Sequence, residues 1–176
     1  DKKQRKTPGE IIEDGIMKSS ERKRVVFATN NLGIGGGEIM LVEQVKHLDR
    51  DRFEPYVVTI LPSPQINVIS KLPRDVKFKE FRFRNLLDLV SLYKLWTFLR
   101  REKIDAVVTS LFDANVVVRA AAILARVPTI VSYEHNIYKD KKRWQIWIDR
   151  VLARFTKKIL VGSTEVLEFT SKQENL

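Results

Sequence analysis

The stretch VVFATNNLGIGGGEIMLVEQVKHL, residues 25–48, decides the fold of this chain. Its first five residues are mostly apolar, as in a buried strand, and residues 30–37 form a glycine-rich turn. From Glu38 to Leu48 the apolar residues recur at helical spacing. A strand, a glycine turn and a helix in this order bring several backbone N–H groups and the positive end of a helix to one point. That point suits an anion, most often a phosphate.

The rest of the chain alternates short apolar strands with amphipathic helices. Further strands are expected at residues 53–61, 76–83, 104–109, 128–133 and 158–161. Helices are expected at residues 36–48, 65–71, 87–103, 114–126, 142–156 and 164–172. This alternation predicts an α/β fold, a Rossmann-like doubly wound parallel sheet with helices on both faces. Ligands in such sheets bind beyond the carboxyl ends of the strands, so we expect Asn30, Ser110 and His135 to meet at one edge.

Two helices carry apolar stripes. In helix 87–103, with Asp88 as a plausible N-cap, the stripe comprises Leu89, Leu92, Tyr93, Trp96 and Leu99. In helix 142–156 it comprises Trp144, Trp147, Ile148, Val151, Leu152 and Phe155, surrounded by lysines and arginines. A basic helix with tryptophans suits an anionic membrane interface, whereas a stripe packed on the core with a solvated basic back is the alternative.

Composition limits the class of protein. The chain has 176 residues, of which 44% are hydrophobic and 31% charged, as in a soluble globular domain. Residues 1–23 have the character of a tail or linker, with one short helix around residues 11–17, and residues 24–176 form the domain. There is no cysteine and the two histidines lie far apart, so we expect no metal site. No signal or membrane-spanning segment is visible, which favours a cytoplasmic location with peripheral membrane association.

The net charge of +10 suits an anionic partner such as nucleic acid, anionic lipid or a phosphorylated substrate. The glycine turn itself argues against two common ligands. The dinucleotide fingerprint needs a glycine where Glu38 stands, and a Walker loop needs a lysine after Gly37. We therefore expect neither NAD binding nor ATP or GTP hydrolysis by these routes, and no cofactor.

Four ordered motifs resemble the start of family 4 glycosyltransferases. They are the GGGE run at 35–38 with the later LDRDRFEPYVV at 48–58, LFDAN at 111–115 with Arg119, VPTIVSYEHN at 127–136, and VGSTEV at 161–166. This family has the GT-B fold, which consists of two Rossmann-like domains. The resemblance covers about residues 24–172 and implies the N-terminal, acceptor-side domain of such an enzyme, without the C-terminal donor domain.

The resemblance implies a retaining, metal-independent transfer of a sugar from a nucleotide sugar to a glycan or lipid-linked acceptor. The chain alone would then be inactive, because half of the donor site is missing. Gly35, Gly36 and Gly37 would hold the donor diphosphate, and His135 would be catalytic. The residues implied to line the acceptor site or cleft are Asn115, Arg119, Glu134, Asn136 and Ser163.

Each of these assignments has a structural alternative. The glycines could form only a tight turn, and His135 could cap a backbone group. Asp113 and Asn115 could cap the helix near residue 114, and Ser163 could cap the last helix. At the level of function, the rivals are a non-catalytic basic α/β domain that binds nucleic acid or an anionic surface, and another GT-B enzyme such as an epimerase. RNA-recognition and zinc-finger signatures are absent, so nucleic acid is not an expected partner.

Overall fold

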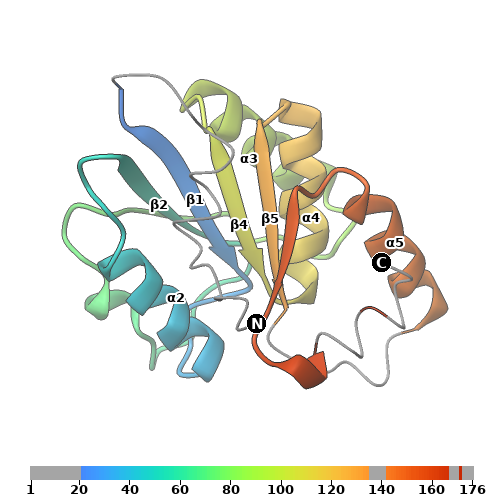
Figure 1. Cartoon of the computed structure of the whole chain (residues 1–176), viewed down its shortest axis with the longest axis horizontal. Coiled ribbons are helices and arrows are strands. Elements are labelled where there is room, and N and C mark those ends of the chain that lie inside the picture. Colours follow the sequence, from blue (N-terminus) through green and yellow to red (C-terminus); the bar gives the residue numbers. More distant parts are fainter. Residues whose placement is uncertain (1–20, 135–141, 167–170, 172–176) are drawn as a thin grey trace, which may run out of the picture.

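The computed structural model describes residues 21–134, 142–166 and 171. Six strands form one sheet in which all neighbours are parallel, in the order β3-β2-β1-β4-β5-β6 (Figure 1). The strands are β1 Lys23–Thr29, β2 Phe53–Thr59, β3 Lys77–Glu80, β4 Ala106–Ser110, β5 Thr129–Glu134 and β6 Lys158–Val161. The predicted parallel sheet is confirmed. Its order reverses between β1 and β4, which makes their junction the topological switch point.

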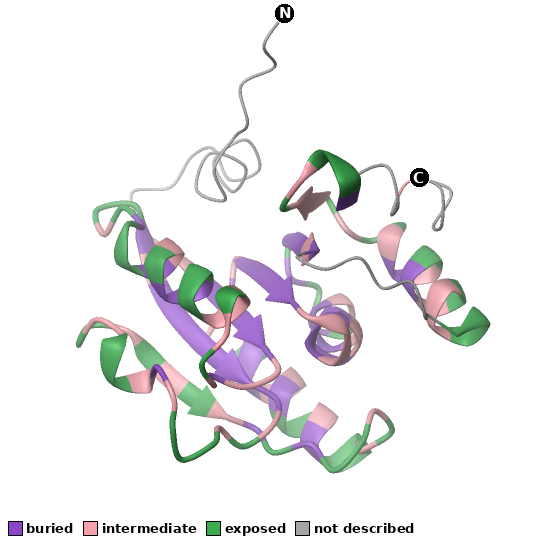
Figure 2. Cartoon of the chain, turned by 90° about the horizontal axis from the view of Figure 1, so that it is seen from below, coloured by how far each residue is buried: buried purple, intermediate pink, exposed green. Residues whose placement is uncertain are grey.

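The helices cover both faces of the sheet, as predicted. They are α2 Gly36–Lys46, α3 Leu89–Arg101, α4 Phe112–Ala125 and α5 Arg143–Ala153. α2 packs on one face with Val25 and Phe27 of β1, whereas α3 and α4 pack on the other with Val26 and Ala28. α5 packs against α4, and the central strands are the most deeply buried part of the domain (Figures 1 and 2). The alternating side chains of buried strands therefore supply two separate cores.

The prediction of a helix at residues 65–71 is wrong. The chain forms only a three-residue 3₁₀ turn there, η1 Ile69–Lys71. Asn67 explains the difference, because its amide donates to the Pro64 carbonyl at 2.8 Å and its oxygen accepts from the Ile69 N–H at 3.1 Å. Such local bonds compete with helix formation. Of the helix expected at 164–172, residues 164–166 are helical, and the expected helix at 11–17 lies outside the described residues.

Asp88 caps α3 as predicted, but the predicted apolar stripe packs on the core only in part, through the buried Leu99 and the half-buried Leu92 and Trp96. The Asp88 carboxylate accepts from the Ser91 N–H at 3.0 Å, and this bond, with a second from the Arg84 N–H, lowers the pKa of Asp88 to about 2. The buried residues are Ser91, Leu95, Phe98 and Leu99. Leu89 and Tyr93 are instead 72% and 64% exposed. Apolar residues surround most of this helix, so its spacing alone does not select the buried face.

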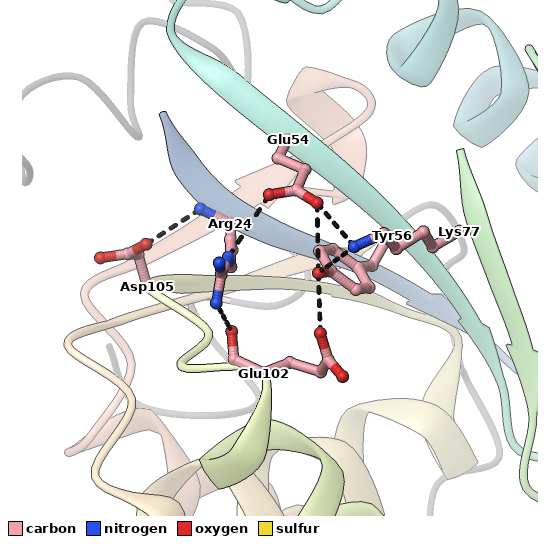
Figure 3. A network of polar contacts seen from close by, with 6 residues as sticks. All are labelled: Arg24, Glu54, Tyr56, Lys77, Glu102 and Asp105. Carbon is pink, nitrogen blue, oxygen red and sulfur yellow. Dashed lines mark hydrogen bonds and ion pairs between the residues drawn. The ribbon is translucent and has the colours of Figure 1, made fainter. Parts of the chain in front are cut away.

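A polar network joins the amino ends of the strands (Figure 3). The Arg24 side chain donates to the Glu102 carbonyl at 2.7 Å and pairs with Glu54 at 3.3 Å. Glu54 also pairs with Lys77 at 2.8 Å, and the Tyr56 hydroxyl donates to the Glu102 carboxylate at 2.9 Å. The bond from Lys77 is the main cause of the lowered pKa of Glu54. The network thus ties β1, β2 and β3 to the end of α3, on the edge opposite the carboxyl ends.

Replacing Glu54 with Gln should lower the free energy of unfolding by about 1 kcal/mol at neutral pH, since two cations lose their shared carboxylate. A lowered folded-state pKa gives stability that is present above the ordinary value of 4.5 and lost as pH falls through the folded value. The variant should therefore lose less stability than the parent on acidification. Urea denaturation at neutral and acidic pH measures both effects. An equal effect of Asp51→Asn, an exposed carboxylate outside the network, would contradict this account.

Candidate functional site

The carboxyl ends of the strands form one edge, which we call the rim, and Asn30 joins its two halves. Asn30 directly follows β1, and its side-chain oxygen accepts from the Ala114 N–H of α4 at 2.9 Å. Its amide donates to the Asp113 carboxylate at 3.3 Å. α4 begins at Phe112 and is capped from the neighbouring strand, so the expectation that Asp113 or Asn115 caps it is wrong.

The junction between β4 and α4 has an unusual backbone. Leu111 has φ 67° and ψ 148°, a region that strongly favours glycine. The preceding Ser110 donates from its hydroxyl to the Ala28 carbonyl at 3.3 Å, which fixes the end of β4 against β1. The switch point therefore combines a strained turn with tight anchoring of the strand before it.

A buried polar network lies beside this junction, between β4, α4 and β5. The Asn115 amide donates to the Glu134 carboxylate at 2.7 Å, and the Ser132 hydroxyl donates to the same oxygen at 3.2 Å. Thr109 donates to the Asn115 side-chain oxygen. These side chains are almost fully buried. The structure thus brings together two of the predicted cleft residues, Asn115 and Glu134, and adds Thr109 and Ser132, which sequence reasoning missed.

The glycine turn enters α2 at the rim. Gly35 is the N-cap with an extended backbone, and no glycine in the described part of the chain has a positive φ. The turn therefore does not depend on the torsion angles that only glycine adopts easily. A Cβ at Gly35 would meet the Glu38 carboxylate at 2.3 Å, whereas one at Gly36 would meet nothing within 4 Å. The space beside the Gly36 Cα is therefore open, and the Glu38 carboxylate lies next to Gly35 at the helix start, where a negative charge is favourable.

Arg119 is placed away from this group. It is only 1% exposed, donates to the Thr156 hydroxyl at 2.8 Å and lies 3.6 Å from the Asp149 carboxylate. Asp149 belongs to α5 and is also buried. We therefore assign Arg119 to the packing of α5 on α4 and not to an acceptor pocket.

The other predicted site residues lie at or beyond the ends of β5 and β6. Ser163 follows β6 and accepts from the Val166 N–H at 3.2 Å, which is the capping role considered for it. Val161 pairs with Glu134, so Ser163 lies just past the rim. His135 and Asn136 fall outside the described residues. His135 directly follows Glu134 in the chain, and the hydrogen bond from Asn115 fixes Glu134 in its buried position.

Among the described residues, no cluster of three or more His, Cys, Asp or Glu side chains could hold a metal ion. In the same part of the chain, no helix is long and apolar enough to cross a membrane.

Comparison with known proteins agrees with this architecture. The family model described as Glycosyltransferase Family 4 matches residues 34–173, so the chain belongs to that family. A search of curated proteins gave no match. Among solved structures, a lipopolysaccharide outer core galactosyltransferase, WaaB, in its apo form is similar with a TM-score of 0.62 and 12% identity. MurG from Acinetobacter baumannii is similar with a TM-score of 0.58 and 15% identity.

These similarities establish one half of a GT-B fold. The alignment covers 85% of this chain and 42% of WaaB, and 79% of this chain and 41% of MurG. The chain thus spans about two fifths of the length of each of these proteins.

Breaking the Arg119–Asp149 pair should destabilise the domain. Arg119→Met removes the charge that compensates a buried carboxylate, which typically costs about 3 kcal/mol or more. Arg119→Met combined with Asp149→Leu should cost clearly less, because it leaves no buried charge. Urea denaturation of the two single variants and the double variant measures this coupling. Parent-like stability of Arg119→Met would remove the packing role assigned to this residue.

Proposed function

We propose that this chain is the acceptor-side domain of a glycosyltransferase that transfers a sugar from a nucleotide sugar to a glycan or glycolipid. The family match over residues 34–173 carries this proposal. The geometry supports it, because the glycine turn, the capped start of α4 and the end of β5 converge on the switch point of the sheet. In open α/β sheets this is where ligands bind. A second, donor-binding domain would follow this one in the whole enzyme.

In the proposed reaction, a hydroxyl of the acceptor attacks the anomeric carbon of the donor sugar on the face from which the diphosphate departs, and the hydroxyl proton passes to the leaving diphosphate. The bond from that carbon to the diphosphate oxygen breaks, and negative charge builds on the leaving diphosphate. The amides of Gly35, Gly36 and Gly37 at the start of α2 would stabilise this charge without a metal ion. The open space beside Gly36 leaves room for the close approach of a phosphate. We further propose that the anomeric configuration is retained.

His135 would act next to the sugar or the acceptor hydroxyl, where an imidazole can donate or accept a hydrogen bond near neutral pH. Asn115 and Glu134 would serve as positioning residues. Both are buried and bonded to each other at 2.7 Å, so they hold the end of β5 without contacting substrate. Asn136 and Ser163 would lie on the side of the cleft next to β6.

Two substitutions in the full-length protein test this proposal. His135→Ala should lower the turnover number by about 10²–10³ while donor affinity changes little, because the nucleotide would sit mainly on the other domain. Gly36→Val should impair donor use, since its side chain would enter the space offered to the diphosphate. It should change the free energy of unfolding by less than about 1 kcal/mol, because that space is empty of protein atoms. Steady-state kinetics over a panel of nucleotide sugars and thermal unfolding give these quantities.

Leu124→Ala is a matched control, since Leu124 is exposed on the last turn of α4, away from the rim. It should leave kinetics unchanged. Near-parental turnover in His135→Ala would remove that residue from the site. Absence of any sugar transfer or nucleotide-sugar hydrolysis by the full-length protein would overturn the proposed activity itself.

We also propose peripheral contact with an anionic membrane through α5, which would suit a lipid-linked acceptor. Trp144 and Trp147 are 46% and 65% exposed, and Phe155 is also exposed. The predicted stripe of this helix is thus only partly buried: its member Leu152 faces the domain together with Asp149, whereas both tryptophans are exposed. Exposed tryptophans next to Arg143 and Arg150 match the side chains that bind the interface of anionic bilayers.

Vesicles of phosphatidylcholine with phosphatidylglycerol should therefore sediment the protein, and Trp144→Ser with Trp147→Ser should reduce the bound fraction several-fold. Raising NaCl from about 0.05 M to about 0.5 M should also reduce it, because surface charges are then screened. Leu124→Ser removes an exposed apolar side chain from α4 and serves as the control. Equal sedimentation of the tryptophan variant and the parent would contradict contact through α5.

A further inference from the structure

A second concave site lies outside the rim, between the edge strand β3 and α3. This groove has a volume of about 850 Å³, within the range of small-ligand sites. The buried rings of Phe81 and Phe98 lie at its base, 5.6 Å apart in an edge-to-face arrangement. Its walls come from the residues following β3 and from the exposed face of α3.

The groove is lined by five cations, namely Lys79, Arg82, Arg84, Lys94 and Arg101. The three carboxylates that also line it are all engaged within the protein. Glu80 pairs with Arg82 at 2.6 Å and accepts from the Ser63 N–H at 2.8 Å. Asp88 caps α3, and Glu102 accepts from the Tyr56 hydroxyl.

The cations are much less engaged than the carboxylates. Lys79 lies over the rings of Phe81 and Phe98, with its ammonium 5.3 and 4.9 Å from their centroids. Within the described part of the chain, no carboxylate forms an ion pair with Arg84, Lys94 or Arg101. With five cations against three carboxylates, the groove carries a net positive charge even though Arg82 pairs with Glu80. Guanidinium groups suit carboxylates and phosphates by their planar, two-pronged geometry.

Tyr93 adds an aromatic surface to this positive lining. Its ring is 64% exposed and lies against Trp96, with centroids 5.4 Å apart, so its orientation is held. An exposed, rigid ring provides a large contact area for the apolar face of a sugar ring. Charge for anionic substituents and a ring for pyranose faces together favour an acidic sugar chain over a simple inorganic anion.

The groove also has a direction. Arg84 and Asp88 lie at the start of α3, next to the rim, whereas Arg101 and Glu102 lie at its far end, beside the amino-edge network of Figure 3. α3 has 13 residues and is therefore about 20 Å long. A chain whose growing end reached the rim could follow the groove away from it.

We infer that the groove between β3 and α3 binds a glycan chain that carries carboxylate or phosphate groups, and that it selects an anionic acceptor. This inference rests on the proposed glycosyltransferase function for the identity of its ligand. The binding itself is independent of catalysis, so it can be measured without the donor site.

Calorimetric titration of the full-length protein with three sugars of equal length tests the inference. The probes are maltohexaose, phosphorylated maltohexaose and the hexamer of galacturonic acid. One or both anionic probes should bind at least tenfold more tightly than maltohexaose, and the tighter one identifies the charged group. Equal affinity for the neutral probe would overturn the inference.

Variants locate the binding. The double variant Lys94→Gln with Arg101→Gln should lower the affinity for the anionic probe at least tenfold. Arg74→Gln with Arg100→Gln removes the same charge from exposed positions that do not line the groove, and should change affinity less than twofold. Equal losses in the two double variants would show general charge attraction and would overturn a site in the groove.

Tyr93→Ala separates a glycan from other polyanions. It should weaken the galacturonate hexamer several-fold without changing the salt dependence of binding, since the lost contact carries no charge. Polyglutamate and single-stranded DNA of equal charge serve as other polyanions. The glycan assignment would be overturned if either bound as tightly as the hexamer and if Tyr93→Ala had no effect on binding of the hexamer. If the groove variants bind the anionic probe as tightly as the parent does, this inference is rejected. If the full-length protein still transfers sugar in that case, the proposed function stands.

Discussion

The parallel pairing of β1 with both β2 and β4 is the constraint on which the rest of the structure depends. All five residues of β4 and most of β1 are buried, so neither strand tolerates a shift that would turn its side chains to the other face. This pairing gives the strands one common carboxyl edge and places the switch point between β1 and β4. The rim exists because these two central strands end side by side.

The two edges of the sheet use polar residues differently. At the amino edge, Arg24, Glu54 and Lys77 form a partly exposed network of charges that ties strand ends together. At the rim, Asn115 and Glu134 are buried and hydrogen-bond to each other, and Thr109 and Ser132 of the adjacent strands bond to the pair. A buried network of this kind orders its surroundings, because a lost partner leaves a buried polar group unsatisfied. The buried network therefore fixes the end of β5 against β4 and α4.

The helices α3, α4 and α5 cover one side of the domain and expose a mixture of apolar and basic residues at both flanks. Arg119 of α4 pairs with Asp149 on the buried face of α5, and Trp144 and Trp147 on the opposite face are exposed. The packing of Phe98 on Phe81 and Tyr56 sets the rotation of α3, which turns Tyr93 and Lys94 toward the groove. The groove beside α3 and the outer face of α5 thus each combine basic residues with an exposed aromatic ring.

The sequence by itself determined the parallel α/β fold, the positions of all six strands and the Asp88 cap, because these follow from local periodicity and from hydrogen bonds a few residues apart. Four ordered motifs also predicted the family. Only the tertiary structure decided which face each helix buries, since α3 and α5 carry apolar residues on more than one face and their partners are distant in sequence. For the same reason, the capping of α4 by Asn30, the Asn115–Glu134 pair and the contact of Arg119 with α5 could not be predicted. Each joins residues that become neighbours only when the buried strands pair and carry their ends to one edge.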